Sequence, residues 1–449
     1  LFRSPHSAYI PASDLEAVNE ELGGSFSGIG VQFNLQNDTI YVVDVISGGP
    51  SEKAGLRDGD RIVTVNDTLF VGKSINNERV MKRLRGPKGS VVQLGIVRQN
   101  APKMLRFKIT RGDIPVHSID VSYMVTPEIG YISVNKFGAN TYKEFLTAIA
   151  KLQKANAKKL IIDLRGNAGG YMDAAVNMLN EFLKKGDLIV YVKGKAYPRS
   201  DSYANGNGSC QNMKIAVLID EFSGSASEIF AGAIQDNDRG TIVGRRSFGK
   251  GLVQQEMDFT DGSSVRLTIA RYYTPTGRSI QKPYSKGKEA YFKESEARFG
   301  NGELYEKDSI KVSDTIKFKT KKGKIVYGGG GIVPDVFVPL EVEHGNESTA
   351  YLLQSGIVGN FVFEQLDKNR SAFKGLTFEQ FKVKMEGTEV YFNAFQKFIF
   401  GNGLDLNFGK SKALVKRYLS AEFARQLYGE SSYYEIVLKE DAMIKAILK

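Results

Sequence analysis

Short apolar segments alternate with longer mixed segments between residues 129 and 246, and this alternation constrains the fold more than any other feature. The apolar segments predict strands at 129–137, 159–166, 214–220 and 240–246. The segments between them predict helices at 141–155, 171–183 and 226–237. Strands and helices that alternate through short connections pack as layers. We therefore expect residues 113–345 to form a mixed α/β core.

Three other regions flank or interrupt this core. Residues 1–23 predict an N-terminal helical segment, and residues 24–112 predict a β-rich domain with glycine turns. Residues 346–449 predict a C-terminal helical extension that is rich in Phe and Tyr. Within the core, residues 283–331 are polar and rich in glycine and charge, which predicts a surface insertion.

The net charge of +11 over 449 residues invites a nucleic-acid interpretation. The basic residues are scattered, however, and the short clusters at 85–89 and 321–324 lie in turn-like sequence. Because no nucleic-acid motif accompanies them, we predict a solvated basic surface and no nucleic-acid partner. No run of eighteen apolar residues predicts a membrane span.

Histidine and cysteine are scarce, which narrows the chemistry. The three histidines, His6, His117 and His344, do not form a metal-ligand spacing such as HExxH. We therefore predict neither a metal nor another cofactor. If the chain is a hydrolase, we expect its base to be a residue other than histidine. The single cysteine, Cys210, cannot form an intramolecular disulfide.

Ser225 lies where a predicted strand turns into a predicted helix, in IAVLIDEFSGSASEIFAGAIQDN. Together with Glu228 it fits the S-x-x-E capping box, in which the serine caps the helix and the glutamate reaches back. The same position suits a nucleophile, because the first N–H groups of the helix can stabilise an oxyanion. The run SGSAS also offers Ser223 and Ser227 as alternatives.

Lys250 follows the next predicted strand, between two glycines in GTIVGRRSFGKGLVQ. Burial among apolar neighbours would lower the pKa of its amine, and a neutral amine could take a proton from a serine. The alternative is a lysine on a surface turn, the commoner place for this residue. Gln254 lies an even number of positions further on, so we expect it on the same strand face, orienting the amine.

A third strand end carries the sequence IIDLRGNAGGYMDAAV. The amides of Gly169 and Gly170 can face a ligand in this turn, although a plain strand–turn–helix connection explains the stretch equally well. Ligand sites in layered α/β folds gather at strand ends, which favours the first interpretation.

The β-rich domain resembles a PDZ domain in its GIGV loop (28–31) and in SEKAGLRDGDRIVTVND (51–67). In such domains, backbone N–H groups of the loop capture a terminal carboxylate, and a peptide adds as an extra strand. We expect Gly28 and Gly30 to allow close approach of the peptide, Ile29 to line the pocket for its last side chain, and Val31 to complete the loop.

The motifs LIIDLRGNAGG, SGSASEIFAGAIQD, FGKGLVQ, YYTPTGRSIQ and GGGGIVPDVFVP follow this domain in order. Over about residues 4–340 the chain resembles the C-terminal processing (tail-specific) proteases, serine endopeptidases with a Ser-Lys dyad and a crotonase-like layered core. The resemblance implies that Ser225 is the nucleophile, Lys250 the general base and Gln254 its support. Ala226 with either Gly169 or Gly170 would form the oxyanion hole.

Further expectations come from the same resemblance. The PDZ domain would bind exposed C-termini of protein or peptide substrates, and Arg85 would couple this binding to the protease. The family's N-P-G-G motif has Ala168 in place of proline here. The helical tail resembles that of Bacteroidetes-type members, and its role is open between binding a partner and forming a homodimer through the terminal helices. The family implies a periplasmic or cell-envelope location.

Two other classes of function compete with the protease hypothesis. One is a proteolytically idle scaffold or adaptor that binds tails through its PDZ domain, which the presence of Ser225, Lys250 and Gln254 disfavours. The other is a crotonase-like acyl-CoA enzyme, which the PDZ-like domain and the position of the lysine disfavour.

Overall fold

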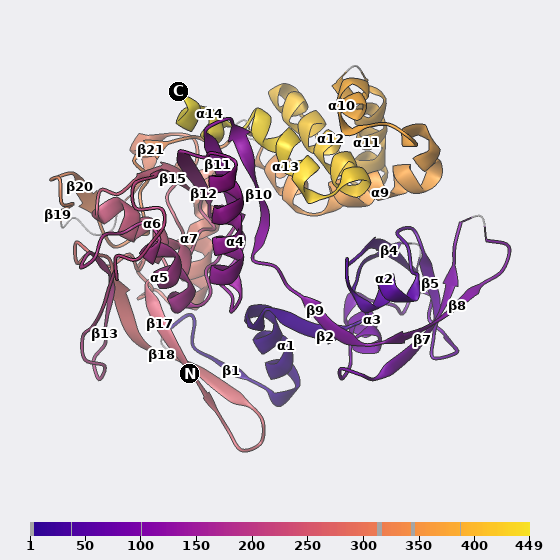
Figure 1. Cartoon of the computed structure of the whole chain (residues 1–449), viewed down its shortest axis with the longest axis horizontal. Coiled ribbons are helices and arrows are strands. Elements are labelled where there is room, and N and C mark those ends of the chain that lie inside the picture. Colours follow the sequence, from indigo (N-terminus) through magenta and orange to yellow (C-terminus); the bar gives the residue numbers. More distant parts are fainter. Residues whose placement is uncertain (1–3, 37, 100, 312–316, 343–345, 387) are drawn as a thin grey trace. The chain divides into compact units, whose positions relative to one another are not determined.

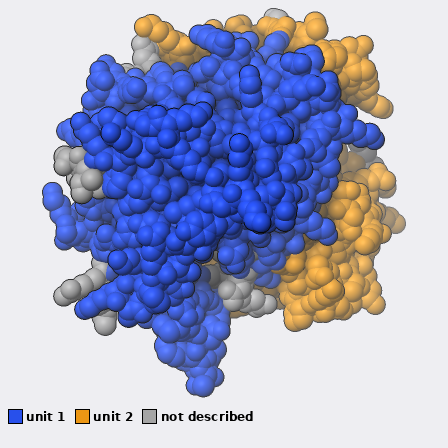
Figure 2. Space-filling view, turned by 60° about the vertical axis from the view of Figure 1, so that its left-hand side comes forward, with its two compact units in different colours: residues 1–24, 117–347, 437–449 blue, residues 25–116, 348–436 orange. Residues whose placement is uncertain are grey.

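The computed structural model describes residues 4–36, 38–99, 101–311, 317–342, 346–386 and 388–449. The chain divides into two compact units, coloured blue and orange in Figure 2. The first comprises Leu1–Gly24, His117–Glu347 and Val437–Lys449, and the second comprises Ser25–Val116 and Ser348–Ile436. The chain therefore leaves the first unit twice and returns to it twice. His344 and residues 312–316 of the predicted insertion lie outside the described residues.

A six-stranded sheet forms the centre of the first unit, in the order β10-β11-β12-β15-β16-β21 (Figure 1). Its strands are Ile119–Thr126 (β10), Ile129–Val134 (β11), Lys159–Asp163 (β12), Lys214–Ile219 (β15), Thr241–Gly244 (β16) and Val336–Phe337 (β21). All neighbours except β10 and β11 are parallel. The connecting helices are α4 (Thr141–Lys154), α5 (Met172–Asn180) and α6 (Ala226–Asp236). The predicted mixed α/β core is therefore confirmed.

The three helices pack on the sheet through one apolar core. Phe145 of α4, Phe182 just after α5 and Phe230 of α6 are fully buried. Their rings meet edge to face, with centroid distances of 6.0 and 6.1 Å. Such aromatic pairs contribute about 0.5–1.5 kcal/mol beyond simple burial. Because all residues of α6 are buried, this core fixes the start of that helix firmly.

A second sheet of the first unit includes β17, the strand that follows Lys250. Its strands are β1 (Ala8–Ile10), β13 (Leu188–Lys193), β14 (Ser200–Tyr203), β17 (Leu252–Asp258) and β18 (Ser264–Tyr273). The order is β1-β18-β13-β14, and β17 also pairs with β18. The N-terminal helix α1 (Ala12–Gly23) follows β1 directly, in the region where a helix is predicted.

The predicted surface insertion is wrong in one important part. Helix α7 (Lys288–Gly300) lies inside it, and the side chains of Tyr291 and Arg298 in this helix are almost fully buried. The polar composition misled the prediction because the buried Arg298 guanidinium is paired with Glu294 of the same helix. After α7, the insertion contains the short hairpin of β19 (Lys317–Lys319) and β20 (Ile325–Tyr327).

The β-rich domain of the second unit contains two sheets and two short helices. The larger sheet has the order β3-β4-β5-β7-β8, with β6 paired to β5, and β2 pairs with β9. These strands are Ser25–Gly28 (β2), Val31–Gln36 (β3), Thr39–Val45 (β4), Arg61–Val65 (β5), Thr68–Leu69 (β6), Val91–Val97 (β7), Leu105–Thr110 (β8) and Gly112–Pro115 (β9). The helices are α2 (Pro50–Ala54) and α3 (Asn77–Leu84). This architecture fits the PDZ expectation.

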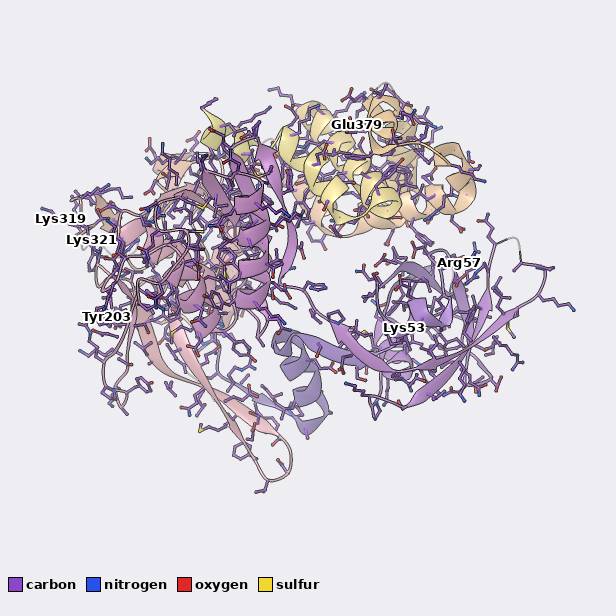
Figure 3. The ribbon with its side chains drawn as sticks, viewed as in Figure 1. Lys53, Arg57, Tyr203, Lys319, Lys321 and Glu379 are labelled. Atoms are coloured by element: carbon purple, nitrogen blue, oxygen red, sulfur yellow. The ribbon has the colours of Figure 1, made fainter. Side chains whose placement is uncertain are left out.

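One buried acid explains the GLRDGD phrase of this domain. Asp60 is fully buried, and its carboxylate accepts the Arg57 backbone N–H at 2.9 Å and two Arg98 guanidinium bonds at 2.7 and 2.8 Å. The Arg57 side chain, like that of Lys53, is exposed (Figure 3). Lys319 in β19 and Lys321 two residues later, which Figure 3 also labels, are exposed residues of the other unit.

The predicted helical extension is divided between the two units. Its helices are α8 (Glu347–Gln354), α9 (Ile357–Asn369), α10 (Phe378–Glu386), α11 (Val390–Gly401), α12 (Lys412–Tyr428), α13 (Glu430–Lys439) and α14 (Ala442–Leu448). Most of this segment belongs to the second unit, but residues from Val437 onward belong to the first. Among the helices that the structure describes, none is long and apolar enough to cross a membrane.

Helix α9 joins the extension to the PDZ-like domain within the second unit. Asn360 accepts a hydrogen bond from Asn34 of β3 at 2.8 Å, and the Phe363 ring packs edge to face on Tyr41 of β4. One turn further on, Asp367 pairs with Arg61 of β5 at 2.7 Å. The three strand residues are cross-strand neighbours, so the helix crosses the strands.

Candidate active site

Ser225 lies between β15 and α6, at the carboxyl edge of the parallel sheet. Its backbone has φ 58 and ψ −114, a combination that L-residues rarely adopt. Strained backbone of this kind persists only where the surroundings enforce it, and it clusters at functional sites. The serine is also the N-cap residue of α6 and is partly exposed. Its position therefore suits a nucleophile at the positive end of a helix.

The two rival serines of the SGSAS run have structural roles. Ser223 is buried, accepts the Asp220 backbone N–H at 2.9 Å and donates to the Leu164 carbonyl at 2.8 Å. Ser227 is buried and donates to the Asn167 carbonyl at 2.8 Å. Neither hydroxyl is available to a substrate. Ser225 is the one member of the run with an accessible side chain.

Glu228 connects the turn of Ser225 to the loop of Lys250. Its Oε2 accepts the backbone N–H of Ser225 at 2.9 Å and that of Lys250 at 2.8 Å. Its Oε1 accepts the Ser247 hydroxyl at 2.5 Å and the Gly249 backbone N–H at 2.7 Å. Burial raises the pKa of this carboxyl, and these hydrogen bonds oppose the shift. Glu228 therefore both completes the capping box of α6 and accepts hydrogen bonds from the loop that carries Lys250.

Tyr272 of β18 also contacts the loop that carries Lys250. Its hydroxyl donates to the Lys250 carbonyl. The phenol is buried, and burial raises its pKa well above the ordinary value. The phenol therefore stays protonated and holds the backbone of Lys250. The sequence offers no local signal for this role, because Tyr272 lies on a different sheet.

The environment of Lys250 favours a neutral amine. Burial lowers its pKa from the ordinary 10.5, the charge of Arg266 lowers it further, and Glu228 opposes both. Among the described residues, no carboxylate forms an ion pair with this amine, and no hydrogen bond joins it to the Ser225 side chain. Lys250 is therefore neither the predicted alternative, an exposed turn lysine, nor an ion-paired one.

The prediction that Gln254 and Lys250 lie on the same face of one strand is wrong. Strand β17 begins at Leu252, so Lys250 lies outside it, and the pairing with β18 shifts register between Val253 and Gln254. Alternation along a strand therefore does not relate the two residues. The Gln254 amide donates to the His6 carbonyl. Its role as a support of Lys250 remains a prediction from the family resemblance.

His6 lies close enough to Lys250 for their charges to interact. Burial, followed by the charges of Lys250, Lys282 and Lys288, lowers the pKa of His6 to about 4, so the ring is neutral at neutral pH. Its Nε2 lies 3.0 Å from the Tyr291 hydroxyl of α7. No local pattern in the sequence predicts this contact.

The loop that carries Lys250 is braced from behind by α7. The Arg298 guanidinium donates to the carbonyls of Ser247 at 2.8 Å and Phe248 at 3.2 Å. It also pairs with Glu294 at 3.0 Å, which in turn pairs with Lys282 at 2.8 Å. The buried Arg298 guanidinium is therefore compensated by the Glu294 carboxylate and by backbone carbonyls. The polar composition of residues 283–331 gave no indication that Arg298 and Glu294 support the loop of Lys250.

The glycine turn after β12 contacts the turn of Ser225. A Cβ added at Gly169 would lie 2.6 Å from the Ser225 Cβ and 2.9 Å from the Ala226 nitrogen, so only glycine fits. The Gly169 N–H, however, donates to the Asn167 side chain at 2.8 Å. It is not free for an oxyanion. Within the described part of the chain, the N–H groups of Gly170 and Ala226 have no acceptor, and they remain the two candidates.

The predicted peptide-binding loop joins β2 to β3 in the second unit. Gly28 ends β2, Gly30 has φ 76, and Val31 begins β3, which is an edge strand of the larger sheet. The Ile29 side chain is only 3% exposed and packs in the core of the domain. It therefore does not line an open pocket, contrary to the prediction. An edge strand next to the loop leaves the expected docking site for an extended peptide.

Arg85 follows α3 in the same domain. Its guanidinium lies 4.4 Å from the centre of the Phe26 ring, and its aliphatic part lies near Gly28 of the binding loop. These contacts place it beside the predicted loop. Its coupling to the protease remains a prediction.

Replacing Glu228 by glutamine is expected to destabilise the first unit by about 2–4 kcal/mol, because either amide orientation leaves two buried donors without an acceptor. The midpoint of denaturant unfolding should fall accordingly. The matched control is Glu289→Gln, which removes an exposed ion pair with Lys293 and should change stability by less than about 0.5 kcal/mol. Equal midpoints for the two variants would contradict the linking role of Glu228.

Three regions of the chain match known families. Residues 128–287 match Peptidase family S41, residues 27–109 match the PDZ domain, and residues 349–429 match a family of unknown function, DUF8443. The region that matches Peptidase family S41 includes Ser225, Lys250 and the glycine turn. The chain therefore contains a region similar to Peptidase family S41 and a region similar to PDZ domains.

Individual relatives show the extent of the similarity. The "Probable CtpA-like serine protease" of Staphylococcus epidermidis (strain ATCC 12228) is 37% identical over 279 residues, which cover 62% of this chain and 56% of that protein. The protein of the same name from Staphylococcus aureus (strain N315) is 36% identical over 62% of this chain and 55% of that protein. The chain thus spans little more than half of these relatives. The solved photosystem II D1 C-terminal processing protease is 28% identical, with a TM-score of 0.41, over 76% of this chain and 79% of that one.

Proposed function

We propose that the chain is a serine endopeptidase that cleaves peptide bonds through Ser225 and Lys250. The observation that carries the proposal is the shared carboxylate of Glu228, whose Oε2 accepts the backbone N–H of both residues. This oxygen brings a strained, accessible serine and a lysine of lowered pKa to one place. Nucleophile and base need this proximity before a proton can pass between them.

The reaction would proceed through an acyl-enzyme. The Ser225 Oγ attacks the carbonyl carbon of the scissile bond while the neutral Lys250 amine takes the hydroxyl proton. The N–H groups of Ala226 and Gly170 stabilise the oxyanion. The intermediate collapses as the Lys250 ammonium returns the proton to the leaving amine. A water molecule then hydrolyses the ester by the same steps and regenerates both residues.

Substrate selection is assigned to the PDZ domain, in agreement with its edge strand and glycine loop. We propose that it binds the exposed C-terminal tail of a protein or peptide substrate. The backbone N–H groups of the loop would bind the terminal carboxylate, and the tail would extend β3. The periplasmic location and the homodimer remain proposals that rest on the family resemblance.

A peptide with a free C-terminus is expected to be cleaved with a kcat/KM about 10–100-fold higher than the same peptide with an amidated C-terminus. Hydrogen bonds to a charged group contribute about 1.5–3 kcal/mol, which corresponds to this range. Steady-state kinetics on the matched pair measures the ratio. Equal rates would contradict tail recognition and leave the dyad untouched. Tight binding of the free tail without any cleavage would instead support the idle scaffold.

A further inference from the structure

Residues from Val437 onward belong to the first unit, whereas the helical residues that precede them in sequence belong to the second. Asp441 begins helix α14, and its Oδ1 accepts the backbone N–H groups of Met443 and Ile444, both at 2.9 Å. The Asp441 side chain is buried, with 6% of its surface exposed. An acid that caps a helix in this way has a fixed position.

The other oxygen of Asp441 binds Arg165, which lies in the turn between β12 and the glycine pair Gly169 and Gly170. Its Oδ2 accepts from Arg165 Nη1 at 2.6 Å. The same guanidinium donates to Asp163 through Nη2 at 2.6 Å and through Nε at 3.0 Å. Burial opposes the charged form, but the two carboxylates raise the pKa of Arg165 well above its ordinary value. The arginine is thus held from two sides, one at the end of β12 and one at the start of α14.

Arg165 stands at the beginning of the segment that ends in the oxyanion candidates. Next to it, the Gly166 N–H donates to Asp220 at 3.0 Å. The Asn167 carbonyl then accepts from the Gly224 N–H at 3.0 Å, immediately before the nucleophile. The Asn167 side chain accepts the Gly169 N–H. A displacement of Arg165 would therefore move the adjoining backbone of residues 166–169. The hydrogen bonds of this backbone reach both the glycine turn and the residue before Ser225.

Loss of Asp441 from its ion pair with Arg165 is expected to have a strong effect on the position of Arg165. Removing one member of a buried charged pair leaves the other without compensation, at a cost well above that of an exposed pair. Without Asp441, Asp163 is the one ion-pair partner of the guanidinium among the described residues, and it also accepts the Tyr131 hydroxyl at 2.6 Å. The Met443 sulfur, 3.9 Å from Arg165 Nη1, carries no charge. The turn would then lose its only described ionic contact with α14.

We propose that Asp441 is a positioning residue for the active site, because its ion pair with Arg165 holds the turn that presents the Gly170 N–H. The inference rests on the proposed peptidase function and assigns a role to the C-terminal end of the helical extension. In sequence, Asp441 follows the whole helical segment of the second unit, so the core is completed by residues that come after that segment.

The test uses Asp441→Asn in the full chain. Asparagine also caps helices well, so α14 should remain, while the charge that binds Arg165 is lost. Misplacing an oxyanion donor or a reacting group costs about 10²-fold in rate, and we expect kcat to fall about 10–100-fold with KM within about twofold. The control is Lys445→Met in the same helix, which removes an exposed ion pair with Glu440 and should leave kcat unchanged.

Hydrogen exchange of residues 164–171 supplies a readout that does not depend on activity. We expect faster exchange in Asp441→Asn than in wild type and in Lys445→Met. If exchange and kcat are both unchanged, the positioning role is wrong. If the wild-type chain has no activity that depends on Ser225, the proposed function fails, and exchange alone decides the role of Asp441. A fall in kcat with unchanged exchange would also contradict the proposal.

Discussion

Ser225→Ala is expected to lower kcat/KM for peptide cleavage by about 10⁴-fold or more, because no other group can form the acyl-enzyme. The fold should survive. The Glu228 contact with residue 225 uses its backbone N–H, which alanine retains. The positive φ of 58 costs alanine about as much as serine. Steady-state kinetics together with circular dichroism would separate loss of chemistry from loss of structure.

The matched control for this variant is Ser285→Ala, an exposed serine of the same unit. It should retain wild-type kinetics. Residual cleavage by Ser225→Ala at more than about a hundredth of the wild-type rate would contradict the assignment, since water alone cannot replace an activated nucleophile at that level.

Lys250→Met is expected to lower kcat/KM by about 10²–10⁴-fold, the usual contribution of a general base. Methionine has a similar length and preserves packing in the half-buried loop. In the wild type, only the neutral amine acts as base, so kcat/KM should rise with pH and level off above the pKa of Lys250. That pKa is lowered from 10.5 by burial and by Arg266. The rising limb should therefore lie below pH 10.5 and disappear in Lys250→Met.

Lys250→Arg is the sharper control, because arginine keeps the positive charge but does not lose its proton. It should be as inactive as Lys250→Met. Activity in Lys250→Arg near the wild-type level would show that the charge, rather than the base, matters at this position. The mechanism would then need a different proton acceptor.

The sequence predicts the α/β core well because its signal is local. Apolar runs and helical segments between residues 129 and 246 alternate at the spacing that the sheet and helices require. The position of Ser225 is predicted for the same reason, since the strand, the turn and the capping glutamate lie within a few residues. Glu228 is only half predicted. Its bonds to Ser247, Gly249 and Lys250 depend on how a distant loop folds over it.

The failures have physical causes that a sequence does not display. The assignment of Gln254 assumed a strand that includes Lys250, whereas β17 starts later and contains a register shift. The insertion was predicted to lie on the surface because charged residues are usually exposed. In the structure, Arg298 is buried and is paired with Glu294 and with backbone carbonyls. The contact with those carbonyls is tertiary, so composition alone misses it.

The most direct test of the account is covalent labelling with a small serine-reactive fluorophosphonate, followed by peptide mapping by mass spectrometry. The account predicts one adduct, on Ser225, that is absent in Ser225→Ala and forms more slowly in Lys250→Met. The buried and hydrogen-bonded Ser223 and Ser227 should stay unmodified. An adduct on either of these, or an active enzyme that carries no adduct on Ser225, would contradict the central claim.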